Sequence, residues 1–173
     1  MVKAQETLKS SATMTVSLAS PAQMQAFAAR LAPFAEPGDV LALAGDLGSG
    51  KTTFARGFIN ALFAAHHLPP EDVPSPTFTL IQEYPLPGFT LYHVDLYRIE
   101  TEAELYELGL DDAFAEGVSL IEWPDRLGSM LPANRLEIAF RQGGPADDEE
   151  LRFADLTAFG AWNGRIPMGT LNG

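Results

Sequence analysis

Hydrophobic and polar residues repeat along the first part of the chain with two different periods. Residues 14–18 alternate, which is typical of a short strand. The next stretch has apolar side chains at helical spacing, and it predicts a helix that follows a cap at Ser20 and ends before Pro37. The apolar run 39–45 ends at a glycine and predicts a buried parallel strand. Residues 51–65 then return to helical spacing and predict a second helix with Phe54, Phe58, Leu62 and Ala65 on one side.

The middle of the chain changes to strand-like patterns. Residues 78–85 and 89–98 are separated by the turn-like "LPG", so they predict an antiparallel β-hairpin. The stretch 101–117 predicts one or two short helices that end at Gly117. The run "VSLIEW" at 118–123 predicts another buried strand, and two terminal strands are expected around the acidic loop "QGGPADDEE".

Composition limits the kind of protein that these elements can form. The chain has 173 residues and nearly half are apolar, which suits one domain with a substantial core. There is no long apolar run or secretory leader and no cysteine, so we expect a cytoplasmic protein without membrane, disulfide or thiolate–metal sites. The formal charge of −12 opposes direct binding to a nucleic acid backbone and favours a basic protein surface as partner.

The segment between the apolar run 39–45 and the second helix reads "GDLGSGKT" and fits the pattern G-x-x-x-x-G-K-[ST]. Glycines let backbone N–H groups approach a phosphate closely, and the helix that follows adds the positive end of its dipole. A lysine here can reach the outer phosphates, and the hydroxyl after it can ligate Mg²⁺. We therefore predict a nucleotide site formed by Asp46, Leu47, Gly48, Ser49, Gly50, Lys51 and Thr52, with Thr53 as a weaker candidate.

These observations together predict an α/β fold, namely a P-loop NTPase-like mixed sheet flanked by helices and containing a β-hairpin. We expect a flexible leader at residues 1–12 and a single P-loop ATPase domain at 13–156. Residues 157–173 have no clear period, which is typical of a disordered tail.

Two carboxylates lie where strands are expected to end. A Mg·nucleotide site needs a carboxylate at the end of a neighbouring strand, and Asp95 ends the mostly apolar "LYHVD". Glu122 follows the run "VSLI", where it could orient or deprotonate a water, although an ordinary exposed glutamate fits the same spacing. Trp123 could stack on a base or a partner, or cover the sheet edge. His93 is expected to be a packed neighbour of this site, in preference to a metal ligand.

A proline-stiffened segment, "PSPTFTL", offers two further candidates. Ser75 or Thr77 could sense a terminal phosphate, although a locally capped turn explains the same composition. Arg98 and Arg126 could clamp transition-state charge or could pair with surface acids.

Five segments in order form a more specific pattern than the phosphate loop alone. They read "GDLGSGKTTFARG" (45–57), "SPTFTL" (75–80), "YHVDLYRI" (92–99), "ELGLDD" (107–112) and "IEWPDRL" (121–127). Over roughly residues 14–141 the chain resembles the TsaE family, also called YjeE. Members of this family are small bacterial P-loop ATPases of tRNA threonylcarbamoyladenosine synthesis.

This resemblance implies binding and slow hydrolysis of ATP with Mg²⁺. It also implies action beside TsaB and TsaD, the pair that transfers a threonylcarbamoyl group to an adenosine next to the tRNA anticodon, so that tRNA is met only indirectly. Carried over by motif, it implies catalytic roles for Lys51, Asp95 and Glu122, and metal contacts from Thr52, Asp95 and Glu122. Thr77 falls in the switch-like segment, and Trp123 falls near the nucleotide or partner surface.

Other classes of nucleotide-binding protein remain open on the residues alone. A GTPase would normally carry N-K-x-D to read guanine, and that string is not in this sequence, which favours adenine or weak selection of the base. A small P-loop kinase that phosphorylates a small molecule would need an arginine-rich lid, and no Lys or Arg lies between Arg56 and Arg98. A third possibility is a nucleotide-gated assembly subunit whose binding state matters more than its turnover.

Overall fold

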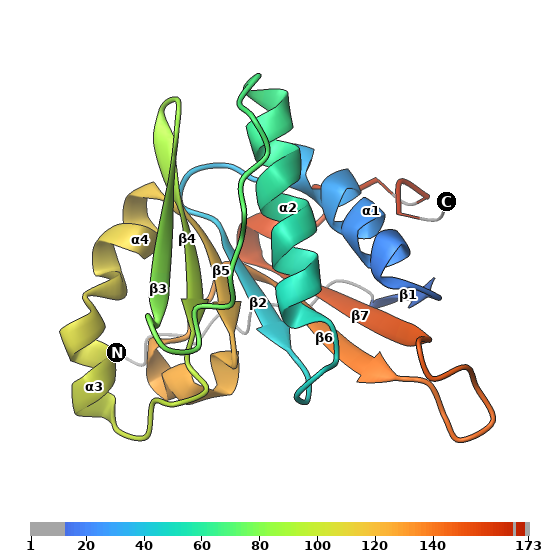
Figure 1. The fold of residues 1–173 in the computed structure, drawn as a ribbon. Helices are drawn as coiled ribbons and strands as arrows, with labels where there is room; N and C mark the ends of the chain where they lie inside the picture. The colour runs from blue at the N-terminus through green and yellow to red at the C-terminus, as the bar shows by residue number, and fades with distance from the viewer. Residues whose placement is uncertain (1–12, 168, 172–173) are drawn as a thin grey trace, which may run out of the picture.

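The structure is a computed structural model that describes residues 13–167 and 169–171, so the expected leader at 1–12 lies outside the described residues. The described strands form one seven-stranded sheet in the order β1-β7-β6-β2-β5-β4-β3 (Figure 1). The strands are β1 (Met14–Leu18), β2 (Val40–Ala44), β3 (Ile81–Leu86), β4 (Phe89–Asp95), β5 (Val118–Glu122), β6 (Arg135–Gln142) and β7 (Arg152–Phe159).

The sheet mixes parallel and antiparallel pairs, as predicted. β2 pairs in parallel with both β5 and β6, and β4 pairs in parallel with β5. The hairpin of β3 and β4 and the pairs that β7 forms with β1 and β6 are antiparallel. The carboxyl ends of β2, β4 and β5 therefore meet at one edge of the sheet, which is where ligands bind in folds of this kind.

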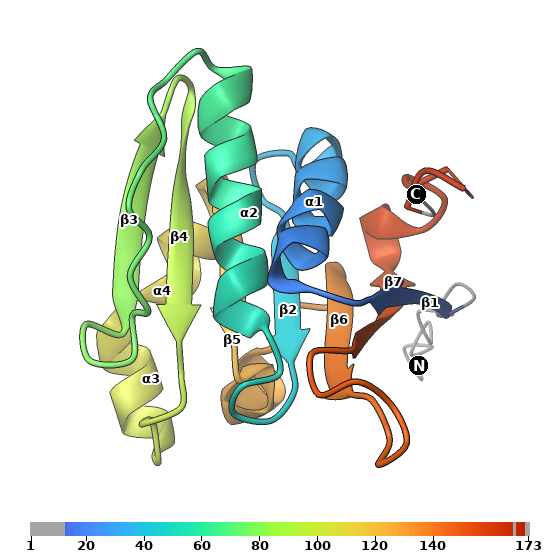
Figure 2. The same cartoon turned by 45° about the vertical axis from the view of Figure 1, so that its right-hand side comes forward.

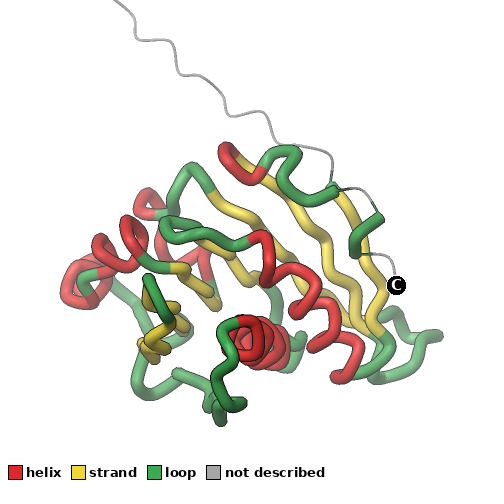
Figure 3. The backbone as a smooth tube through the Cα atoms, turned by 90° about the horizontal axis from the view of Figure 1, so that it is seen from above, coloured by secondary structure: helices red, strands yellow, loops and turns green. Residues whose placement is uncertain are grey.

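Helices cover both faces of the sheet, and each face has its own core. Helices α1 (Pro21–Leu31) and α2 (Lys51–Ala65) lie side by side over the central strands (Figure 2). Their apolar side chains pack on one core cluster with Leu43, Leu91 and Leu120. Helices α3 (Glu102–Leu108) and α4 (Leu110–Glu116) and the 3₁₀ segment η2 (Pro124–Met130) supply the other cluster, so the sheet runs between helical layers (Figure 3).

Local sequence explains where α1 begins and which side of α2 is buried. Ser20 caps α1, since its side chain accepts a hydrogen bond from the backbone N–H of Gln23 at 3.2 Å, and Pro21 occupies the first helical position. In α2 the expected face is buried at Phe54, Phe58 and Leu62. Ala65 was expected on the same face but is exposed, because it lies at the last residue of the helix, beyond the sheet-covered turns.

The hairpin starts later than the sequence pattern predicts. Residues 78–80 form a turn, and β3 begins only at Ile81. The N–H of Leu80 donates to the carbonyl of Pro76 at 2.7 Å, and Leu80 has a positive φ of 66°. This tight turn takes the chain out of the extended conformation, so the apolar residues before Ile81 do not join the sheet.

The expected domain boundary at residue 156 falls inside a strand, and residues 157–167 are packed against the rest of the domain. Pairing with β6 carries β7 on to Phe159, opposite Arg135. The 3₁₀ segment η3 (Gly160–Trp162) follows, and Trp162 is buried in the core. Arg165 then forms an ion pair with the mostly buried Asp39. Periodicity missed this segment because single buried side chains, spaced irregularly, anchor it.

Within residues 13–167 and 169–171, none of the helices has both the length and the apolar character that a bilayer span requires.

Candidate nucleotide-binding site

The loop between β2 and α2 needs glycine at several positions. Gly45, Gly48 and Gly50 have positive φ angles of 140°, 75° and 108°, which residues with a Cβ rarely adopt. A Cβ on Gly45 would lie only 2.5 Å from the backbone oxygen of Phe140 in β6. The loop therefore turns tightly against the sheet edge and meets the amino end of α2, the end that favours anions.

Lys51 is the first residue of α2, and its ammonium group turns back into this loop. Nζ donates to the backbone oxygens of Gly45 and Asp46 at 2.6 and 2.8 Å, and it lies 4.2 Å from the centre of a Trp123 ring. Burial lowers the pKa of Lys51 below its ordinary value, while the charge of nearby carboxylates, Glu122 foremost, opposes that effect. The charge is thus held by neutral acceptors that a phosphate can replace.

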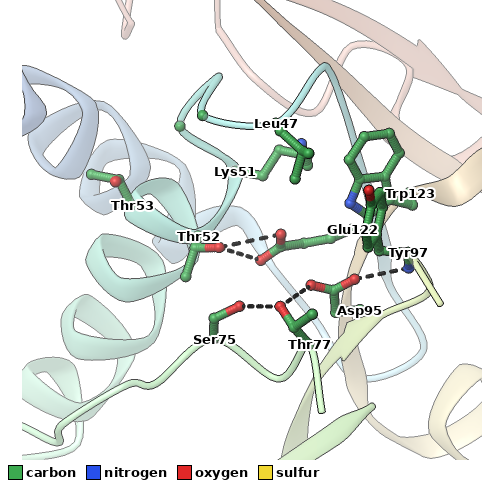
Figure 4. Close-up of a pocket in the computed structure, with 12 residues that line it drawn as sticks. Leu47, Lys51, Thr52, Thr53, Ser75, Thr77, Asp95, Tyr97, Glu122 and Trp123 are labelled. Carbon is green, nitrogen blue, oxygen red and sulfur yellow. Dashed lines mark hydrogen bonds between the residues drawn. The ribbon is translucent and has the colours of Figure 1, made fainter. Parts of the chain in front are cut away.

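Glu122 ends β5 and is almost fully buried. The Thr52 hydroxyl donates to its two oxygens at 3.0 and 3.3 Å (Figure 4). On its other side, His93 Nε2 lies 2.7 Å from Oε1. Parallel pairing sets Glu122 directly opposite Asp95 of β4. Two strands that are distant in sequence therefore bring both predicted carboxylates to one place.

Asp95 is also buried, and each of its oxygens accepts one hydrogen bond. The Thr77 hydroxyl donates to Oδ2 at 3.1 Å, and the backbone N–H of Tyr97 donates to Oδ1 at 2.9 Å. The Ser75 hydroxyl lies 2.8 Å from that of Thr77, so a chain of hydroxyl groups runs from the loop to the carboxylate. The proline-stiffened segment "PSPTFTL" is thereby hydrogen-bonded to Asp95, the candidate metal ligand (Figure 4).

These side chains surround a cavity of about 260 Å³. Its lining includes most of the predicted residues: Leu47, Gly48, Gly50, Lys51, Thr52, Thr53, Thr77, Asp95, Glu122 and Trp123. Asp46 and Ser49 do not line it; they face a separate hollow beside Phe140. The motif placed these two in the candidate set because it takes consecutive residues, whereas the turning loop directs Asp46 and Ser49 to its other side.

Tyr97 also lines the cavity, and the sequence interpretation missed it as a site residue. Its ring centre lies 5.0 Å from that of Trp123, and it is partly exposed at the cavity mouth. The only signal was its place in the quoted segment "YHVDLYRI", two residues after Asp95. Trp123 itself has a positive φ of 60°, so the chain turns sharply after β5 and sets this ring beside Lys51.

The two candidate arginines lie away from this cavity. The Arg98 guanidinium lies 5.2 Å from the ring centre of Phe78, and Arg126 donates to the backbone oxygen of Ile99 at 3.1 Å. Neither is among the cavity-lining residues in the described part of the chain. A clamp on phosphate charge from either side chain would need a rearrangement.

The oxygen groups in the cavity suit Mg²⁺ that arrives with a nucleotide. Thr52, Asp95 and Glu122 offer a hydroxyl and two carboxylates. Among the described residues, no three or more His, Cys, Asp or Glu side chains gather in a way that could hold a metal ion by themselves. Mg²⁺ commonly takes one or two carboxylates and completes its shell with substrate phosphates and water, so these residues fit that mode of binding.

The model of one protein family, described as "Threonylcarbamoyl adenosine biosynthesis protein TsaE", matches residues 18–150. The chain belongs to the TsaE family. A protein named tRNA threonylcarbamoyladenosine biosynthesis protein TsaE from Bacillus subtilis (strain 168) is 45% identical over 135 residues, which cover 78% of this chain and 80% of that one. The TsaE protein of Rickettsia bellii (strain RML369-C) is 36% identical over 140 residues, or 81% and 92% of the two chains.

A solved structure has the same fold. The crystal structure of Bacillus subtilis YdiB aligns with a TM-score of 0.69 and 37% sequence identity, covering 86% of this chain and 87% of that chain. The predicted α/β fold with a mixed sheet is thus confirmed by both the topology and the structural relative.

Proposed function

We propose that this protein binds ATP with Mg²⁺, hydrolyses it slowly, and so supports tRNA threonylcarbamoyladenosine biosynthesis, the process for which its family is named. One observation carries the proposal. Lys51 and Thr52, at the amino end of α2, face Asp95 and Glu122, which register sets side by side at the ends of β4 and β5. This combination of hydrogen-bond donors for phosphate, a hydroxyl and paired carboxylates is what ATP hydrolysis requires.

Each side chain has a distinct role in this proposal. Lys51 exchanges the carbonyls of Gly45 and Asp46 for the outer phosphates. Thr52 and Asp95 hold Mg²⁺, which when bound neutralises phosphate charge. Glu122 is a buried carboxylate that can orient the attacking water and accept its proton.

Slow turnover by the isolated chain follows from what the cavity lacks. Among the described residues, its lining includes no arginine, and an arginine in the transition state accelerates phosphoryl transfer about 10³- to 10⁵-fold. We propose that a TsaB–TsaD-like protein complex is the partner and that tRNA is met through that complex. The lack of an arginine lid also disfavours the kinase alternative.

One observation favours a second candidate, the nucleotide-gated assembly subunit. Lys51 lies against Trp123, which in turn contacts the partly exposed Tyr97, and Leu47 at the same cavity is exposed. Capture of a phosphate by Lys51 would therefore alter a surface that a partner protein can reach. In that case the bound nucleotide matters more than its hydrolysis.

The test measures binding and chemistry separately. We expect calorimetry to show Mg·ATP binding by the parent and by Glu122→Ala, and little binding by Lys51→Ala. Phosphate release should fall at least about tenfold in Glu122→Ala and in Asp95→Ala. Absence of any Mg·ATP binding by the parent would overturn the proposal.

Reconstitution then addresses the pathway and the alternatives. Threonylcarbamoylation of tRNA adenosine over many turnovers should need the chain together with ATP. If Glu122→Ala supports it as well as the parent does, the gated-subunit candidate holds. Transfer of the terminal phosphate to a small molecule, with none to water, would instead identify a kinase.

A further inference from the structure

His93 occupies an unusual place for a polar side chain. It lies in the middle of β4 with no exposed surface, on the sheet face that α1 and α2 cover. Its strand neighbour two residues before, Leu91, and its cross-strand partner, Leu120, both belong to the apolar core of that face. An imidazole here has been removed from water at a cost that a leucine would not incur.

The hydrogen bonding of His93 is directed at a single group. Nε2 lies 2.7 Å from Glu122 Oε1, while Nδ1 is buried and has no hydrogen-bond partner in the described structure. An ionised carboxylate can only accept a hydrogen bond, so Nε2 is the donor to Glu122. Among the described residues, Glu122 is the one hydrogen-bond partner of this imidazole, so the imidazole is placed to hold that carboxylate.

Glu122 has a hydrogen-bond partner on each of two sides, and only one of these partners is expected to keep its contact when a nucleotide binds. On the cavity side its partner is the Thr52 hydroxyl, which the proposed Mg²⁺ contact would engage. On the core side its partner is His93, which does not line the cavity and is fixed in the strand ladder. Once Thr52 turns to the metal, His93 is the donor that still fixes the carboxylate.

We propose that His93 is a positioning residue that holds the Glu122 carboxylate in the orientation needed for ATP hydrolysis. This inference rests on the role proposed above for Glu122. His93 does not line the cavity, so its loss should lower kcat and leave nucleotide affinity unchanged. Removal of groups that orient ligands and catalytic side chains commonly lowers activity about 10- to 100-fold.

Three substitutions separate orientation from packing. His93→Gln can place an amide N–H as many bonds from Cβ as Nε2, whereas His93→Asn can reach only the position of Nδ1. His93→Leu has no donor. We expect His93→Gln to keep kcat within about threefold of the parent, and His93→Asn and His93→Leu to lose about tenfold or more, with KM and the Mg·ATP dissociation constant within about twofold in all three.

A neighbour in the same strand supplies the packing control. Val94 is fully buried but belongs to the core of the opposite face. Val94→Ala should lower the melting temperature and leave kcat unchanged. If turnover instead follows melting temperature across all four variants, or if His93→Leu hydrolyses ATP at the parental rate, the positioning role is overturned.

Glu122→Ala in the same assay keeps the two proposals distinguishable. If Glu122→Ala is slow while His93→Asn and His93→Leu are fast, the inference about His93 fails and the proposed function stands. If Glu122→Ala itself turns over normally, the catalytic role of Glu122 is wrong and the inference falls with it.

Discussion

Thr52 donates its hydroxyl to the Glu122 carboxylate, at 3.0 Å from one oxygen and 3.3 Å from the other. The residue predicted to ligate the metal and the residue predicted to activate water are thus bound to each other. In the function proposed above, both groups exchange this contact for new ones when a Mg·nucleotide enters. The site is assembled but its key groups are engaged with one another, which is consistent with the slow turnover that we propose.

Removal of the Thr52 hydroxyl should separate metal-dependent from metal-independent binding. We expect Thr52→Ala to weaken ATP binding about tenfold or more with Mg²⁺ present, and to change it little in EDTA, because the hydroxyl acts on the metal. Isothermal titration in both buffers measures this. Thr52→Ser, which keeps the hydroxyl, is the matched control and should bind like the parent; equal losses with and without Mg²⁺ would contradict the role.

Nucleotide binding should be visible in tryptophan fluorescence. A phosphate that draws Lys51 Nζ away from the loop carbonyls also removes the cation from the Trp123 ring, 4.2 Å away. We expect ATP to change the emission of the parent and of Trp162→Phe, since Trp162 is buried in the core near the carboxyl end of β7. Trp123→Phe should abolish the change while calorimetry still detects binding; a signal that persists in Trp123→Phe would place its origin elsewhere.

Two loop glycines should differ in their tolerance of a methyl group. Gly45 and Gly48 both have positive φ, but only at Gly45 would a Cβ meet a backbone oxygen, at 2.5 Å, whereas the space at Gly48 is open. We expect Gly48→Ala to cost about 1–2 kcal/mol of unfolding free energy from backbone strain. Gly45→Ala should cost roughly 3 kcal/mol or more, because the Phe140 backbone cannot move aside easily. Urea unfolding of both variants compares the two, and equal costs would show that the loop shifts freely.

Acid should weaken one contact between strands. Asp155 of β7 accepts from the Thr15 hydroxyl at 2.6 Å and from Arg141 at 3.0 Å, and these bonds, that of Thr15 first, lower the pKa of its carboxyl from the ordinary 3.8. Because the folded-state pKa is the lower one, the stabilisation is complete above about pH 4 and is lost as pH falls through the folded-state value.

The corresponding measurement is urea unfolding of Asp155→Asn and the parent at several pH values. At pH 7 the variant should be less stable by about 1 kcal/mol, since the site is partly exposed. The difference should shrink below pH 3.8, down to the lowest pH at which both remain folded. A difference that stays constant with pH would show that the charge of Asp155 does not matter.

Most of the regular structure could be predicted because its signals are local. Helix α2 and the hairpin of β3 and β4 depend on residue spacing and turn residues within a few positions of each other. The start of that hairpin was placed too early because the local turn at Leu80 was not recognised, and the other main error arose where non-local packing decides the outcome. Trp162 is one such case, since nothing beside it in sequence indicates that its ring is buried.

The sequence by itself determined the glycine-rich loop for which we propose phosphate binding, because the glycines, Lys51 and Thr52 lie within one short segment and their chemistry needs no distant partner. It also marked Asp95 and Glu122 as candidates from the strands that they end. Only the tertiary structure decided that Glu122 meets Thr52 and His93, because strand register and the placement of α2 on the sheet are set by packing of the whole core.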